Sequence, residues 1–297
     1  MQLAAFPKGY LDDIAVHRTM SLFEWIDMAR ALDCEGLEIY DGFLLSPDPA
    51  YLDRVRLALD EAGFAMPMLC CSPDFTNPDA AARERAIARE AELIRVARHL
   101  GGPGTRCRVL SGQRYPEVDV EQGLEWVAGA IERLLPVARE HDVVLALENH
   151  YKDGHWRYPE FAQRGEVFLR LLDLIPEREH FGVQYDPSNA IVAGDDPIWL
   201  LHRVADRVVS VHASDRFLAP GASLEDLRQS DGTIGYSPVF QHGVVGRGLN
   251  DYDAIFAILQ ESGYDGWVSI EDGVNGMGEM AESLAFLRGM QAKHFGE

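Results

Sequence analysis

The sequence predicts a single (β/α)8 barrel, and two observations carry that prediction. Eight short apolar segments have the pattern of strands, and stretches with the spacing of amphipathic helices lie between them. Alternation of strands and helices is typical of a parallel sheet, and eight such units fit the 297 residues of one barrel. We therefore expect one catalytic domain over residues 1–297, with its active site at the carboxyl ends of the strands.

The predicted strands are runs of apolar and β-branched residues, as in strands that are buried on both faces. In chain order they cover residues 2–6, 36–41, 66–72, 107–111, 143–148, 181–186, 208–212 and 267–271. The predicted helices cover residues 21–32, 51–62, 79–100, 123–141, 166–175 and 253–262. Ser21 stands three residues before Glu24, the spacing of a capping box, and Gly63 and Gly263 follow helical runs.

Composition describes an ordinary globular protein and limits its partners. The formal net charge of −21 argues against nucleic acid, because phosphate backbones need a basic surface. No apolar run reaches membrane-spanning length, and the four cysteines lack zinc-motif spacing, so we expect reduced thiols in a cytoplasmic enzyme. Residues 217–241 are too many for an ordinary connection, and we expect a lid or an oligomer contact there. A homo-oligomer or a small accessory subunit is left open.

Four of the predicted strands end at a side chain that could bind a divalent cation. These side chains are Glu148, Asp186, His212 and Glu271. Parallel strands would bring them to one place. Three carboxylates and one imidazole form a mostly oxygen-donating site, which suits Mn²⁺, Mg²⁺ or Co²⁺ more than structural zinc. The alternative is four unrelated polar residues at strand ends, where polar residues are common.

The order and surroundings of these residues resemble the xylose isomerase-like TIM-barrel superfamily, in particular its sugar isomerases and epimerases. The segment Asp186-Pro187-Ser188-Asn189 resembles the D-x-x-[HN] motif after the sixth strand. His212-Ala213-Ser214-Asp215 resembles the H-x-x-D motif after the seventh. Gly246-Arg247-Gly248, followed by Asp251-Tyr252, resembles the turn that precedes the seventh helix. The likeness covers nearly the whole chain, and it is specific for the superfamily, not for one reaction.

The resemblance implies a metal-dependent isomerase or epimerase that acts on a small sugar. One divalent cation, Mn²⁺ before Mg²⁺ or Co²⁺, would be held by the four side chains named above. A bound cation polarises a carbonyl, makes the neighbouring C–H acidic and stabilises the enediolate that forms. In epimerases of this superfamily the first and last metal-binding glutamates move the proton, so Glu148 and Glu271 inherit that role.

One departure from the epimerases concerns a histidine. Asn189, which we expect to bind substrate, stands where such epimerases often have histidine. An extra imidazole, His150, lies two residues after Glu148, and residues two apart in an extended segment face the same side. His150 could therefore act as a base near neutral pH, and the alternative is a histidine that only caps the strand end.

The loop at residues 151–161 is rich in aromatic and charged side chains, which suit a sugar ring and its hydroxyls. We expect substrate contacts from Lys152, His155, Trp156, Arg108 and Glu38. The loop resembles those of members that cleave 3-oxo-glycosides, including C-glycoside deglycosidases, by β-elimination. Three functions thus stay open: a sugar isomerase or epimerase, a metal-dependent lyase acting on an oxidised glycoside, and a sugar-binding barrel without chemistry.

Overall fold

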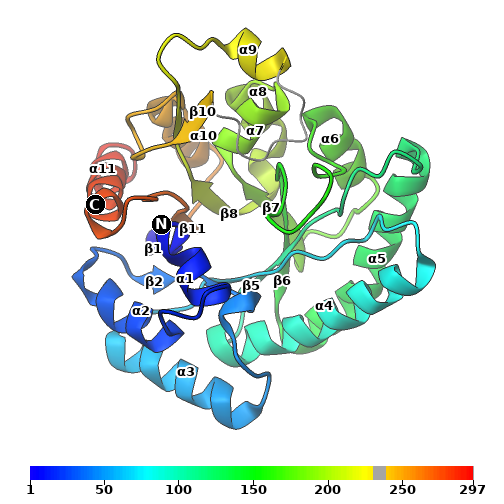
Figure 1. The fold of residues 1–297 in the computed structure, drawn as a ribbon, viewed down its shortest axis with the longest axis horizontal. Coiled ribbons are helices and arrows are strands. Elements are labelled where there is room, and N and C mark those ends of the chain that lie inside the picture. The colour runs from blue at the N-terminus through cyan, green and yellow to red at the C-terminus, as the bar shows by residue number, and fades with distance from the viewer. Residues whose placement is uncertain (230–238, 297) are drawn as a thin grey trace.

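A parallel sheet curled into a barrel forms the centre of the protein (Figure 1), and the computed structural model describes residues 1–229 and 239–296. The barrel strands are β1 (Gln2–Ala5), β2 (Gly36–Leu37), β3 (Ile39–Tyr40), β4 (Met68–Cys70), β5 (Arg106–Val109), β6 (Val144–Glu148), β7 (Phe181–Tyr185), β8 (Val208–Ala213) and β11 (Trp267–Ile270). All eight predicted strands are confirmed, and the second is divided by Glu38 into β2 and β3.

The sheet is nearly closed because its two ends belong to the same predicted strand. The strands are hydrogen-bonded in the order β2-β1-β11-β8-β7-β6-β5-β4-β3, and all neighbours are parallel. β2 pairs with β1, and β3 pairs with β4, so the chain on either side of Glu38 closes the ring. The fold prediction of a (β/α)8 barrel is therefore confirmed.

Helices surround the strands (Figure 1). They are α1 (Leu11–Ala15), α2 (Leu22–Met28), α3 (Pro49–Ala62), α4 (Ala80–Gly101), α5 (Val120–His141), α6 (Gly165–Asp173), α7 (Pro187–Ala193), α8 (Pro197–Val204), α9 (Leu224–Gln229), α10 (Tyr252–Glu261) and α11 (Met277–Phe295). The capping box at α2 is confirmed, since Ser21 Oγ accepts from Glu24 N while Glu24 Oε2 accepts from Ser21 N. Gly63 ends α3 with a φ of 81°, a left-handed conformation that favours glycine.

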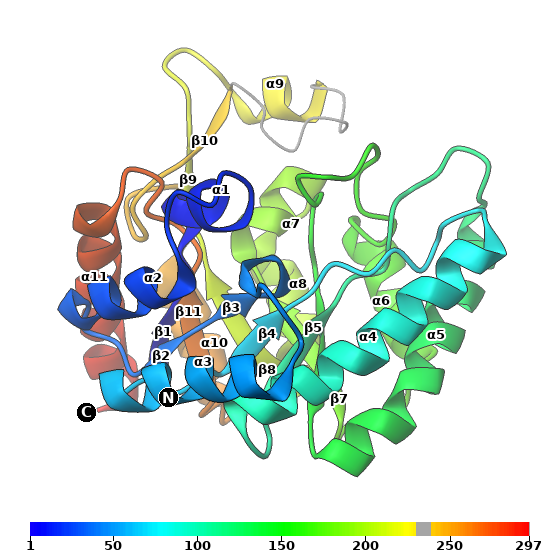
Figure 2. The same ribbon diagram turned by 60° about the horizontal axis from the view of Figure 1, so that its bottom comes forward.

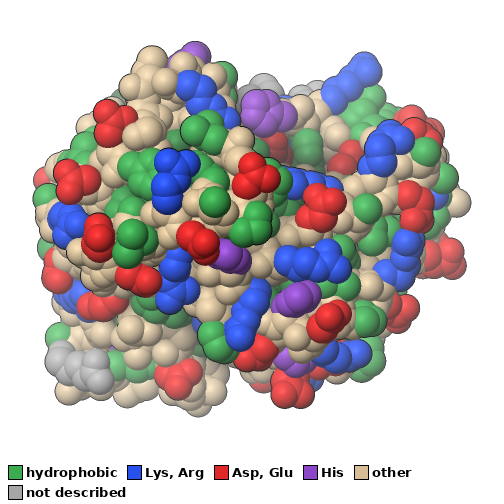
Figure 3. Space-filling view, turned by 90° about the horizontal axis from the view of Figure 1, so that it is seen from below, with side chains coloured by type: hydrophobic (Ala, Val, Ile, Leu, Met, Phe, Trp, Pro, Cys, Tyr) green, Lys and Arg blue, Asp and Glu red, His purple; other side chains and the backbone are tan. Residues whose placement is uncertain are grey.

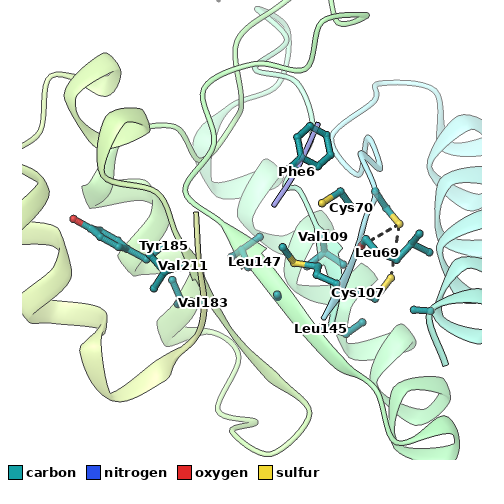
Figure 4. Close-up of a cluster of buried hydrophobic side chains, with 14 of the residues drawn as sticks. Phe6, Leu69, Cys70, Cys107, Val109, Leu145, Leu147, Val183, Tyr185 and Val211 are labelled. Atoms are coloured by element: carbon teal, nitrogen blue, oxygen red, sulfur yellow. Dashed lines mark hydrogen bonds between the residues drawn. The ribbon is translucent and has the colours of Figure 1, made fainter. Parts of the chain in front are cut away.

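The hydrophobic core lies between the barrel and its helices. Outward-facing strand residues such as Leu69, Val109, Leu147 and Val183 are fully buried and lie close together (Figure 4). Because side chains alternate along a strand, the intervening residues face the barrel interior. Several of those interior residues are polar, and the four predicted metal ligands are among them.

An antiparallel hairpin rises above the carboxyl ends of the strands (Figure 2). It consists of β9 (Arg216–Leu218) and β10 (Phe240–His242), and α9 lies between these strands in the chain. The long stretch 217–241 was predicted to be a lid or an oligomer contact, and its residues 230–238 lie outside the described part of the chain.

The described surface fits the composition. Acidic and basic side chains are interspersed over the face shown in Figure 3. Among the helices of residues 1–229 and 239–296, none has the length and apolar character needed to cross a membrane.

Candidate metal and substrate site

The four predicted metal ligands lie together inside the barrel. One donor atom from each of Glu148, Asp186, His212 and Glu271 can be chosen so that all four lie within 4.8 Å of one another. Glu148 ends β6, Asp186 and Glu271 directly follow β7 and β11, and His212 lies near the end of β8. All four are buried. Parallel pairing of the strands therefore brings these four strand ends together, as predicted from the sequence.

Two buried atoms in this cluster lack the partner that a cation would supply. Asp186 Oδ2 and His212 Nδ1 have no hydrogen-bond partner within the described residues. His212 Nδ1 lies 3.5 Å from both Glu148 Oε1 and Glu271 Oε2, which is too long for a good hydrogen bond. Buried polar atoms are rarely left unpaired, so this arrangement fits a bound metal ion.

Charge in the cluster points the same way. Burial, together with the carboxylates of Glu271 and Glu148, raises the pKa of Asp186 to about 6. The cluster thus concentrates more negative charge than its neighbours neutralise, and a divalent cation would relieve that repulsion.

Glu38 holds the imidazole of His212 in place. His212 Nε2 lies 2.7 Å from Glu38 Oε2, and both side chains are fully buried. A carboxylate on the second nitrogen of a metal-binding histidine fixes the ring orientation and raises its basicity. Glu38 was predicted to contact substrate, and in the structure its carboxylate contacts His212 and Cys70.

Each of the two glutamates in the cluster accepts a hydrogen bond from a cationic side chain. Arg108 on β5 donates from Nη1 to Glu148 Oε2 at 2.8 Å, and Lys8, which follows β1, donates to Glu271 Oε1 at 3.0 Å. Although burial opposes ionisation, Arg108, His150 and His212 lower the pKa of Glu148 to about 2. Lys8 and His212 likewise hold the pKa of Glu271 well below its usual range against the effect of burial. Both glutamates are therefore anionic at neutral pH.

Asn189 completes the surroundings of Glu148. Its Nδ2 donates to Glu148 Oε1 at 3.2 Å, and its backbone N–H donates to Asp186 Oδ1 at 2.9 Å at the start of α7. Ser214 Oγ donates to the same Asp186 oxygen at 2.7 Å. Asp186 is thereby fixed through one oxygen, and its other oxygen faces the cluster without a described partner.

A polar cavity of about 310 Å³ opens beside this cluster. The wall of the cavity includes Lys8, Tyr40, Arg108, His150, Lys152 and Glu271. His155 also contributes to the wall, whereas Trp156 is buried in the loop and, like Glu38 and Asn189, is not part of the cavity wall. A cavity of this size with mixed polar and apolar walls suits a small polyhydroxylated molecule.

His150 faces a buried carboxylate, Glu160, that was not predicted from the sequence, and the two facing atoms are not hydrogen-bonded to each other. Its Nδ1 lies 3.5 Å from Glu160 Oε2, and its ring stacks on Tyr151 with centroids 5.0 Å apart. Ser111 fixes the other oxygen of Glu160 through its backbone N–H at 2.6 Å and its hydroxyl at 2.5 Å. Ser111, which follows β5, thus orients Glu160. The second oxygen of Glu160 faces the imidazole of His150, which lines the cavity.

Lys8 and Glu160 are two of the residues at the site that were not predicted from the sequence. Lys8 follows the first strand by three residues, so its place at the carboxyl end was readable from the topology. The position of Glu160 could not be predicted in this way, because it depends on an isolated antiparallel bridge between Gln113 and Glu160.

Asp215 of the H-x-x-D motif organises the loop above β8. Its carboxylate accepts backbone N–H groups of Gly246, Gly248 and Asn250 at 2.9, 2.8 and 3.2 Å. A Cβ at Gly248 would stand 2.2 Å from Asp215 Oδ1, so only glycine permits this approach. The resemblance to the family turn therefore has a structural reason.

We expect Asp215→Ala to lower the free energy of unfolding by about 1–3 kcal/mol, because it leaves the buried Asn250 N–H without an acceptor and also removes the acceptor of the less buried Gly246 and Gly248 N–H groups. Chemical denaturation of the two proteins measures this difference. Arg247→Ala is the control in the same loop, because its ion pair with Glu282 is exposed and worth little. Equal stabilities for the Asp215 variant and the parent would contradict the assigned role.

The chain matches the xylose isomerase-like TIM barrel family over residues 26–290, and it belongs to that family. Among curated relatives, it is 25% identical over 158 residues to the inosose dehydratase of Lacticaseibacillus casei. That match spans 50% of this chain and 47% of the relative, so the chain aligns with about half the length of that protein.

Solved structures share the fold over the full length. A D-tagatose 3-epimerase-like protein has a TM-score of 0.75 at 15% identity, with 100% of this chain and 99% of the other covered. The IolI protein with a bound zinc atom has a TM-score of 0.73 at 15% identity, and both chains are covered completely. At these identities the likeness shows the fold, and the resemblance drawn from the sequence motifs is confirmed at the level of the family.

Proposed function

We propose that this protein is a metal-dependent sugar isomerase or epimerase that removes a proton next to a carbonyl. The observation that carries the proposal is the cluster of Glu148, Asp186, His212 and Glu271, in which two donor atoms lack a hydrogen-bond partner and one member, Glu271, lines a polar cavity. The three carboxylates favour Mn²⁺ or a similar hard cation. The names of family relatives, an epimerase-like protein and an inosose dehydratase, agree with chemistry on small polyhydroxylated ketones.

A cation held there would polarise the substrate carbonyl and stabilise the negative charge that develops beside it. The residues of the chain supply the remaining functions. Glu271 lines the cavity, Glu148 lies in the same cluster on another strand, and the two are the proton-transfer pair that the family resemblance implies. Arg108 and Lys8 orient these two carboxylates, and Lys152 and His155 on the cavity wall would hydrogen-bond substrate hydroxyls.

One arrangement favours the second candidate, a metal-dependent lyase that cleaves a 3-oxo-glycoside by β-elimination. Each glutamate of the proposed pair already accepts a charged donor, which makes it a weak base. The His150–Glu160 pair provides a separate base on the cavity wall. An elimination needs a base for the C–H and an acid for the leaving group, and the name dehydratase of the curated relative describes an elimination of water.

Incubation with a free ketohexose in D₂O separates the candidates. An isomerase or epimerase incorporates solvent deuterium next to the carbonyl and yields a second monosaccharide. A lyase leaves the free ketohexose unchanged but releases the leaving group from a 3-oxo-glycoside. The metal-stripped protein is the control, and it should be inactive in both assays.

A sugar-binding barrel without chemistry would give no product from either substrate. Its affinity for sugar would also be unchanged after the metal is removed. That pair of results would overturn the proposal that the protein is an enzyme.

A further inference from the structure

A second group of potential metal ligands lies in the wall of the barrel, outside the cavity. Cys71 follows β4, Cys107 lies on the neighbouring strand β5, and Glu90 reaches them from helix α4. The three donor atoms lie within 4.8 Å of one another, and all three side chains are buried. Cys107 sits among the outward-facing residues of the core (Figure 4), so this group belongs to the layer between strands and helix.

The distances within this group match the edges of a tetrahedral metal site. The two sulfur atoms are 3.8 Å apart, and Cys107 Sγ lies 3.4 Å from Glu90 Oε1. Zinc bonds sulfur at about 2.3 Å and carboxylate oxygen at about 2.0–2.2 Å, which gives tetrahedral edges of roughly 3.8 Å and 3.5 Å. These two pairs of donor atoms already have the separation that a tetrahedral zinc ion requires, and the third pair lies within 4.8 Å.

Charge in this part of the core supports the same conclusion. Within residues 1–229 and 239–296, Glu90 has no ion pair with a lysine, arginine or histidine, although it is 1% exposed. Burial raises the pKa of Glu90 to about 8, against the lowering effect of its contact with Cys107. A buried carboxylate is stable when it is protonated or when it binds a cation, and a cation would displace its proton together with those of the thiols.

We propose that Cys71, Glu90 and Cys107 form a second metal site that takes a thiophilic divalent cation such as Zn²⁺. Two thiolates and one carboxylate select zinc or cadmium, whereas the oxygen-rich cluster at the strand ends selects harder cations. The bound ion would join β4, β5 and α4, and it would exchange slowly because all three donors are buried.

The second site is also linked to the first through one side chain. The backbone carbonyl of Cys71 accepts from Arg108 Nε at 3.0 Å, and Arg108 donates to Glu148 at 2.8 Å. The wall site therefore adjoins the residue that orients a ligand of the cavity site.

The experiment tells the two sites apart by their ligands, because the wall site has two cysteine thiolates and the four-residue cavity cluster has none. One sample of the full-length protein is produced with zinc in the medium and analysed for metal. A second sample is freed of metal by unfolding with a chelator, refolded, and titrated with Cd²⁺ while the ultraviolet thiolate-to-cadmium absorption is recorded. We expect the band at one equivalent of Cd²⁺ and its retention in His212→Ala. The His212→Ala protein should also keep about one equivalent of zinc.

The band and the zinc of the His212→Ala protein should be lost when Cys107→Ala is added. Glu90→Gln, which disturbs packing less, should weaken cadmium binding at least tenfold. Cys34→Ala and Cys70→Ala are the matched controls, and both should keep the band.

Absence of the band in the parent protein, at a Cd²⁺ concentration that fills the cavity site, would overturn the proposal. It would leave three protonated groups that only contact one another. A disulfide between Cys71 and Cys107, identified by peptide mapping of the denatured protein, would overturn it as well.

Discussion

Replacement of Asp186 by asparagine is expected to strip the protein of its cavity metal and to abolish turnover. Asp186 presents one oxygen to the cluster with no described partner, and an amide in its place supplies a neutral and weaker ligand. Loss of a residue that merely supports a metal ligand lowers affinity by about 10–100-fold, so loss of the ligand itself should exceed that range. His212→Ala should behave in the same way.

Metal content after dialysis measures this effect, and Mn²⁺ titration gives the change in affinity. Ser269→Ala is the matched control, because Ser269 is buried in the barrel interior on β11 but is not part of the cluster. Thermal unfolding of the metal-free proteins shows whether the fold is kept. Full occupancy of the cavity site in both the Asp186 and His212 variants would refute the assignment of the ligands.

His150→Gln is expected to lower turnover by about 10²–10⁴-fold, the usual contribution of a positioned general base. Glutamine is close in size to histidine and keeps a polar group facing Glu160, but it cannot take up a proton. Metal content and thermal stability should stay close to those of the parent, because His150 is outside the four-ligand cluster. His202→Gln, at an exposed position of helix α8, is the control, and it should retain the activity of the parent.

The outcome for His150 also decides between the two proposed reactions. A large loss with the metal retained means that a base separate from Glu148 and Glu271 is needed, which favours the lyase. Unchanged turnover leaves the two glutamates as the only proton-transfer pair, which favours the epimerase. Glu160→Gln tests whether Glu160 acts by positioning His150. If it does, the variant should change the pH profile of turnover more than the affinity for substrate.

The barrel and the ligand cluster could be predicted from sequence because both follow from local patterns. Each barrel strand is a buried run that ends at a defined residue, and parallel pairing then fixes where Glu148, Asp186, His212 and Glu271 meet. The C-terminal helix α11 was not among the predicted helices. Its apolar side chains do not form one stripe, although Leu284 and Leu287 are fully buried.

The residues around the cluster were less predictable because their partners are distant in the chain. Glu38 was expected in the substrate site, yet it contacts His212, 174 positions away. Arg108 was expected to meet substrate, and it also binds Glu148. The hairpin of β9 and β10 has strands of only three residues, too short for an alternation pattern to reveal.

The pairing of the first strand with the last has a consequence for how this protein is made. β1 takes its place only between β2 and β11, and Gln2 lies opposite Trp267. A nascent chain can therefore pair β1 with β2 early, but the other edge of β1 stays open until β11 has been synthesised. Glu271 comes directly after β11, so the last metal ligand and the closing strand become available together. Nascent chains shorter than this can offer at most three of the four ligands, and metal capture should coincide with completion of the barrel.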